Sequence, residues 1–137
     1  MFIEPKEDVN QLARLVLDAA MEVHRTIGPG YMESIYEEAL SLELDLRGIL
    51  FKRQHPISIS YKGKMIGEGR LDLLINDKLI IELKAVEQIL PVHKAQLISY
   101  LKMTGCSLGI LINFNAAMLK DGIKRVVLSD RIKEDKK

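Results

Sequence analysis

The segment from Gly69 to Ala85 constrains the fold more than any other part of the sequence. It reads Gly-Arg-Leu-Asp-Leu-Leu-Ile-Asn-Asp-Lys-Leu-Ile-Ile-Glu-Leu-Lys-Ala, two apolar runs joined by a short polar turn and interrupted by Asp72, Glu82 and Lys84. Such runs predict a buried β-hairpin. Burying an unpaired carboxylate costs several kcal/mol or forces it to protonate, so these charged residues need a reason to be there. A divalent metal ion that holds a phosphate supplies one, which predicts a metal-dependent site of the nuclease type.

The pairing of the two strands decides whether this site can form. Glu82 and Lys84 are two residues apart on a strand, so their side chains share one face. Asp72 joins them only if the hairpin pairs it opposite Glu82, which requires a three-residue loop at 76–78, or one of five residues. The common two-residue turn would place Asp72 opposite Ile81 and break the site. We therefore predict a loop of three residues, or of five, in place of the two-residue turn.

Two carboxylates this close resist joint ionisation unless a cation lies between them. Oxygen ligands alone favour Mg²⁺ or Mn²⁺, and such an ion lowers the pKa of a bound water and polarises a phosphoryl oxygen. The predicted ligands are Asp72 and Glu82, while Lys84 orients the water or stabilises charge on the phosphate. A solvated hairpin face is the alternative that these three residues alone leave open.

Length and charge limit the classes of protein to consider. The 137 residues, 47% of them hydrophobic, fit one domain spanning 1–137. A net charge of +1 argues against a general polyanion-coating protein, so any contact with nucleic acid must use a local patch. The single cysteine, Cys106, excludes an internal disulfide and Cys-based zinc sites and fits a reducing cytosol. Because no secretory signal or membrane-length apolar run is found, we expect a soluble, cytoplasmic protein.

The apolar spacing predicts a mixed α/β fold. Helices are expected at Lys6–Arg25, Met32–Arg47 and Val92–Thr104. Strands are expected at Ile57–Tyr61, Met65–Ile75, Leu79–Val86, Leu108–Ile112 and Ile123–Leu128. The fourth of these strands is wholly apolar, which is typical of a strand covered on both faces. The tail from Asp130 is expected to fray. The order ααβββαββ implies a mixed central sheet flanked by helices.

Several motifs resemble those of a known family. Asp72 with Glu82-Leu83-Lys84 resembles the core of the PD-(D/E)XK nuclease superfamily, which has a restriction-endonuclease-like fold. Gly30-Tyr31-Met32-Glu33-Ser34-Ile35-Tyr36 resembles the signature of the GxxExxY family, small bacterial and archaeal proteins usually placed in that superfamily. Gln96-Leu97-Ile98-Ser99-Tyr100 is similar to the Gln-x-x-x-Tyr motif of RecB-like exonuclease domains. The resemblance runs from about Val9 to Arg125 and includes Val23-His24, Gly28-Pro29-Gly30, Glu82–Glu87 and Leu111–Asn115.

The resemblance adds roles at the margin of the site. It implies that Glu33 supplies a third metal-site carboxylate, although its spacing alone indicates only an acid favoured by the helix dipole. It also implies that Gln96 binds a metal water and Tyr100 a phosphate oxygen, where spacing alone allows a solvated polar stripe. Tyr36 either hydrogen-bonds within the site or packs as an aromatic. His24 either bonds Glu33 or caps its helix.

Five basic side chains are candidates for phosphate contacts. The alternative interpretation of each is an ordinary charged residue on the surface. They are Arg53, Arg70, Lys120, Lys124 and Arg125, and the loop from 120 to 125 is the best of them. With no tryptophan and seven aromatic residues, extended base stacking is not supported. We expect a Mg²⁺-dependent (or Mn²⁺-dependent) nuclease acting on DNA in preference to RNA, in which sequence-selective cutting needs an oligomer or a protein partner. The alternative is a catalytically weak or inactive nucleic-acid- or partner-binding module that retains the fold.

Overall fold

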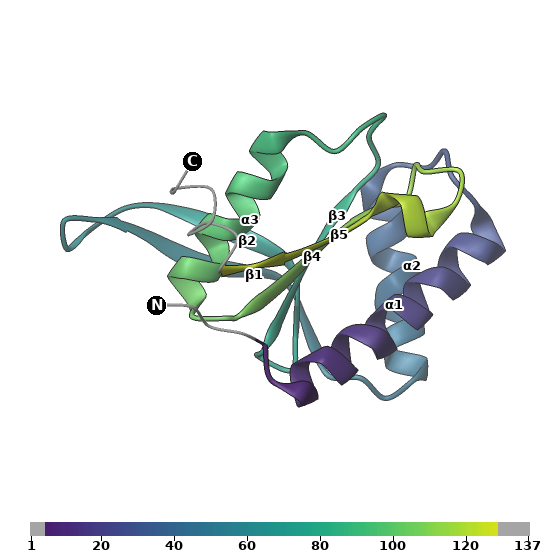
Figure 1. The fold of residues 1–137 in the computed structure, drawn as a ribbon, viewed down its shortest axis with the longest axis horizontal. Helices are drawn as coiled ribbons and strands as arrows, with labels where there is room; N and C mark the ends of the chain where they lie inside the picture. The colour runs from purple at the N-terminus through teal and green to yellow at the C-terminus, as the bar shows by residue number, and fades with distance from the viewer. Residues whose placement is uncertain (1–4, 129–137) are drawn as a thin grey trace.

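Helices and strands follow one another in the predicted order, ααβββαββ, in a computed structural model that describes residues 5–128 (Figure 1). The helices are α1 (Glu7–Ile27), α2 (Glu33–Leu46) and α3 (Pro91–Thr104), with a short 3₁₀ helix, η1 (Leu119–Gly122). The strands are β1 (Phe51–Tyr61), β2 (Lys64–Ile75), β3 (Leu79–Lys84), β4 (Leu108–Asn113) and β5 (Ile123–Val127). They form one sheet in the order β1-β2-β3-β4-β5, in which only the β3–β4 pair is parallel. The predicted mixed α/β sheet is therefore confirmed.

Two strand boundaries differ from the prediction by more than one residue, for physical reasons. Strand β1 begins at Phe51 rather than Ile57, because an edge strand has one free side and so tolerates polar residues and Pro56. Strand β3 ends at Lys84 rather than Val86, whose backbone is bonded by the side chain of Asn113 instead of by a neighbouring strand. The predicted frayed tail lies outside the described residues.

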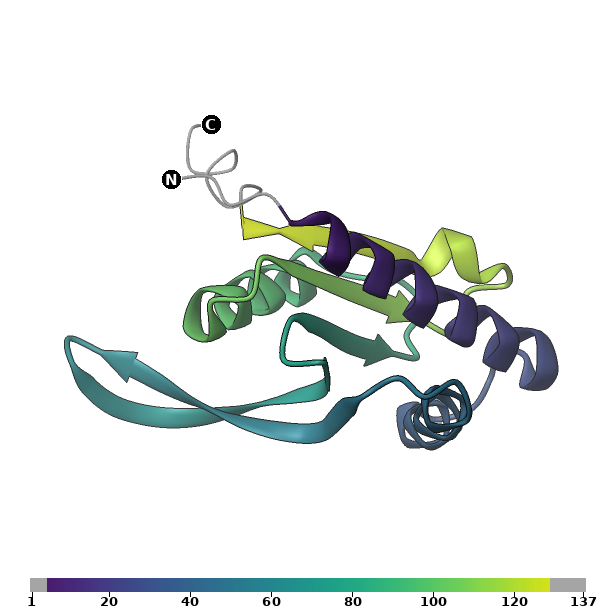
Figure 2. The same cartoon turned by 90° about the horizontal axis from the view of Figure 1, so that it is seen from below.

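The sheet separates two apolar cores. Helices α1 and α2 cover one face and α3 covers the other, as Figures 1 and 2 show from two directions. All six residues of β4 are buried, which confirms the prediction of a strand covered on both faces. On the α3 face, a Cβ at Gly109 would lie 2.7 Å from Cδ1 of Leu97, so this glycine lets the helix approach the strand. Within residues 5–128, no helix has the length and apolar character needed to cross a membrane.

The register of the β2–β3 hairpin is the one the candidate site requires. Leu73 pairs with Ile81 and Ile75 with Leu79, so the loop has three residues, 76–78. Asn76 and Asp77 adopt φ angles of +49° and +59°, a left-handed conformation that these two residue types tolerate. The predicted three-residue loop is therefore confirmed; the ladder ends at Leu73 and Ile81, one residue before Asp72 and Glu82.

Strands β1 and β2 continue well past the end of β3. On the N-terminal side of Leu73, strand β2 has no pair in β3, whereas its pairing with β1 runs on to the pair of Tyr61 and Lys64. The result is a two-stranded ribbon that projects from the body of the molecule, as both views show (Figures 1 and 2). This ribbon, residues 56–70, is called the arm below.

Candidate functional site

Asp72 and Glu82 lie where strands β2 and β3 separate, and each carboxylate bonds the backbone of the other strand. Glu82 Oε2 accepts the backbone N–H of Asp72 at 2.8 Å, and Asp72 Oδ2 accepts the backbone N–H of Leu83 at 2.8 Å. One residue beyond the last strand pair, Leu73 with Ile81, hydrogen bonds between side chain and backbone thus replace those between the two backbones. The two bonds fix both carboxyl groups at the same point between the strands.

This position holds Glu82 in an environment unfavourable to its charge. The residue is 4% exposed, and burial together with the negative charge of Asp72 raises the Glu82 pKa to about 8. Burial also raises the pKa of Asp72, against the lowering effect of its bonds to Leu83 and Gln54. The positive charge of Lys84, two residues along β3, lowers the pKa of both carboxyl groups.

Strand β2 changes faces at Asp72. Leu71 packs in the core under α3, whereas Leu73 packs in the core under α1 and α2, although regular alternation would put both on one face. The register with β1 is the same on both sides of this point, yet Gln54, the residue opposite Asp72, is missing from the ladder and has a φ of +48°. The local distortion brings the Gln54 side chain to the Asp72 carboxylate.

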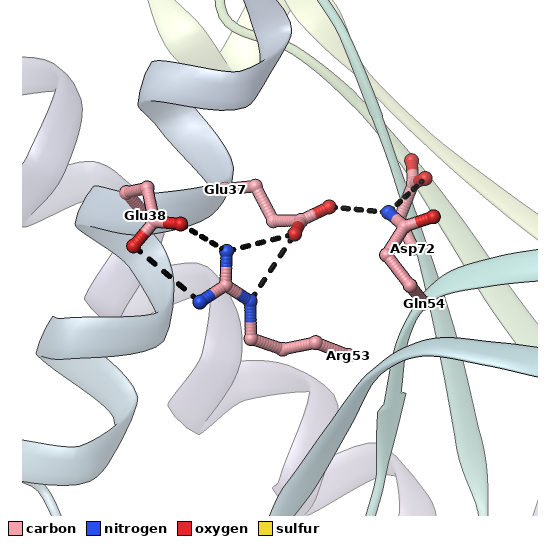
Figure 3. A network of polar contacts seen from close by, with 5 residues as sticks. All are labelled: Glu37, Glu38, Arg53, Gln54 and Asp72. Carbon is pink, nitrogen blue, oxygen red and sulfur yellow. Dashed lines mark hydrogen bonds and ion pairs between the residues drawn. The ribbon is translucent and has the colours of Figure 1, made fainter.

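Helix α2 reaches the site through Gln54. Its Nε2 donates to Glu37 Oε1 at 2.6 Å and to Asp72 Oδ1 at 3.3 Å, so one amide joins two carboxylates (Figure 3). Arg53 holds the other side of Glu37 through a 2.9 Å ion pair and also pairs with Glu38. The negative charge of Glu37 raises the Asp72 pKa. Neither Glu37 nor Gln54 was predicted from the sequence, in which the one indication for Glu37 is its position directly after Tyr36.

Glu33 lies at the start of α2 and is exposed. It lines a cavity of about 270 Å³ together with Glu37, Gln54 and Asp72, and its charge raises the pKa of Glu82. In the described part of the chain, however, no three Asp, Glu, His or Cys side chains are grouped so that they could hold one metal ion. The structure therefore brings together Asp72 and Glu82, and a third carboxylate ligand from Glu33 stays a prediction.

Tyr100 and Gln96 occupy different environments on α3. Tyr100 is buried, and its pKa is raised by burial and by the negative charges of Glu82 and Asp72. Its hydroxyl is therefore close enough to interact electrostatically with both carboxyl groups. The phenol oxygen also accepts a bond from the backbone of Arg70. Gln96, one turn earlier, is exposed. Of this pair, only Tyr100 is shown to be electrostatically linked to the two carboxylates.

Two residues of the predicted motifs support the fold. Tyr36 is fully buried, donates its hydroxyl to the backbone oxygen of Gly28 at 2.6 Å and stacks on Phe114 with ring centroids 4.5 Å apart. It therefore packs, the second of the two roles considered for it. The proposed bond from His24 to Glu33 is wrong: His24 Nε2 bonds the backbone oxygen of Ala116 at 2.8 Å, because the end of α1 lies against the chain that follows β4.

Asn113, at the end of β4, secures the chain that leaves β3. Its Oδ1 accepts the backbone N–H of Val86 at 3.1 Å, and its Nδ2 donates to the oxygen of Val86 at 2.9 Å. The residue is 5% exposed. Since Val86 follows Lys84 by two residues, this clamp also limits where the lysine backbone can lie.

The five basic candidates do not form one patch. Arg53 is held by Glu37 and Glu38, so a phosphate would have to compete with two carboxylates for it, and its contact with phosphate stays a prediction. Arg125 donates to Asn10 at 2.6 Å, which ties it to α1. Arg70, Lys120 and Lys124 are exposed. Arg70 belongs to the arm, whereas Lys120 and Lys124 line separate hollows near the end of the chain.

The donor chemistry of the site fits a hard divalent cation. Both groups are carboxylates, the ligands that Mg²⁺ and Mn²⁺ prefer, and Mg²⁺ commonly binds through one or two of them while keeping several waters. Burial and, after it, the negative charge of Asp72 raise the pKa of Glu82, so a cation bound between the two carboxyl groups would favour the charged form of Glu82. Asp72 and Glu82 are therefore the residues that would hold the ion.

A mixed sheet with Asp and Glu-x-Lys on adjoining strands defines a fold and site of the nuclease class. The sequence profile described as the PD-(D/E)XK nuclease superfamily matches residues 10–126. The chain therefore belongs to the PD-(D/E)XK nuclease superfamily. None of the curated proteins compared with the sequence matches it.

Two solved structures are similar to the chain. The crystal structure of SSO0001 is 26% identical, with a TM-score of 0.49, and the match covers 74% of this chain and 55% of SSO0001. The chain thus spans little more than half of that protein. An alkaline exonuclease, LHK-Exo from Laribacter hongkongensis, is 14% identical with a TM-score of 0.53, over 97% of this chain and 75% of the exonuclease. The second similarity supports the same fold.

Proposed function

We propose that the protein is a divalent-metal-dependent nuclease that hydrolyses phosphodiester bonds in nucleic acid, with DNA preferred to RNA. One observation carries the proposal: Asp72 and Glu82 are fixed at one point between β2 and β3, where Glu82 is buried and resists ionisation. A carboxylate kept in such a place without a functional partner would only reduce stability. Membership of the superfamily supports the same conclusion.

The residues divide the chemistry among them. Asp72 and Glu82 would hold Mg²⁺ or Mn²⁺, and the bound ion supplies a water of lowered pKa and a polarised phosphoryl oxygen. Lys84 orients the attacking water or stabilises negative charge on the phosphate. Tyr100 and Gln96 are proposed to bond a phosphate oxygen and a water of the site. Water forms the new bond to phosphorus as the bond to the leaving sugar oxygen breaks, and a proton passes to that oxygen.

The first test is the melting temperature with and without Mg²⁺ or Mn²⁺. A ligand that binds only the native state raises its stability, so the wild type should melt at a higher temperature with the ion. Glu82→Gln should lose that increase. Asp18→Asn, an exposed acid on α1, is the matched control and should keep it. No increase in the wild type, or an equal one in Glu82→Gln, would argue against a metal site here.

Cleavage of DNA and RNA then tests the reaction itself. Asp72→Asn and Lys84→Ala should each lose at least about a hundredfold in rate, because one removes a metal ligand and the other a group that acts on the phosphate. Unchanged cleavage in both variants would disprove the assignment. Asp18→Asn, the matched control, should cleave at the wild-type rate.

One observation favours the second candidate, a nucleic-acid- or partner-binding module with little activity. Arg53 and Arg125 are engaged by residues of the chain itself, and the net charge of the chain is only +1, so the protein has no large positive excess with which to bind nucleic acid. This candidate predicts a metal-dependent shift in melting temperature without cleavage. Membership of the narrower GxxExxY family, a cytoplasmic location, and an oligomer or partner that provides specificity belong to the proposal as well.

A further inference from the structure

The arm ends in a group of exposed apolar and basic side chains. Tyr61, Met65 and Ile66 are 60%, 68% and 66% exposed, and Lys62 and Lys64 in the same turn are exposed too. Large apolar side chains grouped at the tip of a projecting ribbon indicate a surface that contacts another molecule. They contribute nothing to either core.

The charge of the arm indicates what that molecule is. Residues 56–70 contain three basic side chains, Lys62, Lys64 and Arg70, and one acid, Glu68. The rest of the chain then has 17 basic and 18 acidic residues, from totals of 20 and 19. The positive excess of the whole protein thus resides in this projecting ribbon, which complements a polyanion.

We propose that the arm lies in the major groove of duplex DNA while the site acts on a phosphate of the same duplex. The inference rests on the proposed nuclease function and adds the surface through which the protein would contact a duplex substrate. The major groove of B-DNA, about 12 Å wide, admits a two-stranded β-ribbon, whereas the major groove of A-form RNA is too deep and narrow for side chains to read. Lys62 and Lys64 contact backbone phosphates, and Met65 and Ile66 contact base edges such as the thymine methyl group.

The distance between tip and site is consistent with one duplex that contacts both. The part of β2 from Lys64 to Asp72 spans roughly 26 Å at about 3.3 Å per residue. That length corresponds to about eight base pairs at a rise of about 3.4 Å. Because Asp72 and Arg70 belong to the same continuous strand as the tip, contact with the arm sets the position of the duplex relative to the carboxylates.

Binding of labelled duplex DNA in EDTA tests the inference without cleavage. Lys62→Ala/Lys64→Ala should weaken the affinity of a 24-base-pair duplex roughly tenfold, and the slope of log K against log[salt] should fall by about 1.8, since each lost phosphate contact accounts for about 0.9. Lys6→Ala/Lys102→Ala, two exposed lysines outside the arm, is the matched control and should change neither value. Duplex RNA of the same sequence should bind more weakly and respond little to the arm substitutions.

Three results would overturn the inference: no binding of duplex DNA by the wild type, an equal loss in the control, or equal affinity for duplex DNA and RNA. The competing possibility is that the tip binds a second copy of the chain. Light scattering of wild type and Met65→Ser/Ile66→Ser tests it by measuring the oligomeric state of each. If that variant changed a dimer into a monomer, the tip would belong to self-association instead.

Failure of the arm inference can be distinguished from failure of the nuclease proposal. A three-nucleotide single strand is too short to span the roughly 26 Å from the site to the tip, so wild type and Lys62→Ala/Lys64→Ala should hydrolyse it at the same rate with Mn²⁺. Long duplexes should show an increased KM and an unchanged kcat in the arm variant. Cleavage without arm dependence rejects the inference alone, whereas arm-dependent binding without any cleavage rejects the nuclease proposal.

Discussion

At the scale of single residues, the two carboxyl groups of the site are well hydrogen-bonded, but their surroundings disfavour negative charge. Asp72 and Glu82 each accept a backbone N–H at 2.8 Å, which satisfies donors that the strand ladder leaves without a partner. The same arrangement buries Glu82 beside a second carboxylate and raises its pKa to about 8. The stability of the metal-free protein should therefore depend on the protonation of Glu82 above all, and in the same direction on that of Asp72.

The pH dependence of unfolding tests that conclusion. A raised pKa in the folded state means that the contribution of Glu82 is complete below about pH 4.5 and is lost as pH rises towards 8. In EDTA, the wild type should lose roughly 3 to 5 kcal/mol of unfolding free energy across that interval. Glu82→Gln should lose much less, because an amide stays neutral and still accepts the Asp72 N–H. Urea unfolding at pH 5, 6.5 and 8 measures both, and parallel pH profiles for the two proteins would refute the argument.

Gln54 provides a second prediction at this scale. Its amide donates to both Glu37 and Asp72, so Gln54→Ala removes two hydrogen bonds to charged acceptors and leaves the carboxylates without the group between them. We expect a loss of about 1 to 3 kcal/mol in unfolding free energy. Gln88→Ala, an exposed glutamine after β3, should change it by no more than about 0.5 kcal/mol. Equal effects of the two substitutions would show that the bridge does not contribute to stability.

At the scale of elements, periodicity in the sequence predicted the regular part of the hairpin and failed where the backbone departs from regular alternation. The three-residue loop at 76–78 was predicted by counting residues across the hairpin, because side chains alternate along paired strands. The roles of Gln54 and Glu37 could not be predicted in this way. They depend on the positive φ of Gln54 and on the change of face at Asp72, which no alternation of apolar residues encodes. The apolar pattern likewise could not show that β1 extends back to Phe51, since edge strands tolerate polar residues.

The clamp between β4 and the chain after β3 yields a prediction of this scale. Asn113→Ala removes both bonds to the Val86 backbone and should cost about 2 kcal/mol or more, because it leaves polar groups of a partly buried segment without partners. Amide exchange at Val86 should accelerate at least about tenfold. Asn115→Ala is the matched control, since Asn115 is exposed and its side chain makes only a 3.4 Å contact with Val86.

The consequence for the site distinguishes a clamp from a general loss of stability. Lys84 directly precedes the clamped segment, so Asn113→Ala should reduce the cleavage rate even at temperatures where the variant is fully folded. Exchange at Val86 that is unchanged relative to the wild type would show that the side chain does not restrain this segment.

At the scale of the whole molecule, stability and substrate contact are assigned to different parts of the chain. The apolar side chains of β2 that pack in the two cores begin at Leu71. The arm beyond Leu71 consists of two strands that pair only with each other. Tyr100 of α3 lies against Gly69, and no helix covers the arm beyond that contact. The cores, by contrast, lie on both faces of β4. The protein should therefore tolerate the loss of the arm tip far better than the loss of one core side chain.

Replacing residues 60–66 with Asn-Gly tests this division. Ile59 and Gly67 are directly opposite each other, so a two-residue loop between them closes the hairpin in register and also removes the irregularity next to Ile59. The shortened protein should lose less than about 1 kcal/mol of unfolding free energy, whereas Leu111→Ala in β4 should cost about 2 to 5 kcal/mol. Urea unfolding of the two variants beside the wild type gives the comparison. A large loss on shortening would mean that the arm stabilises the body of the protein, and its exposed side chains would then need no external partner to explain them.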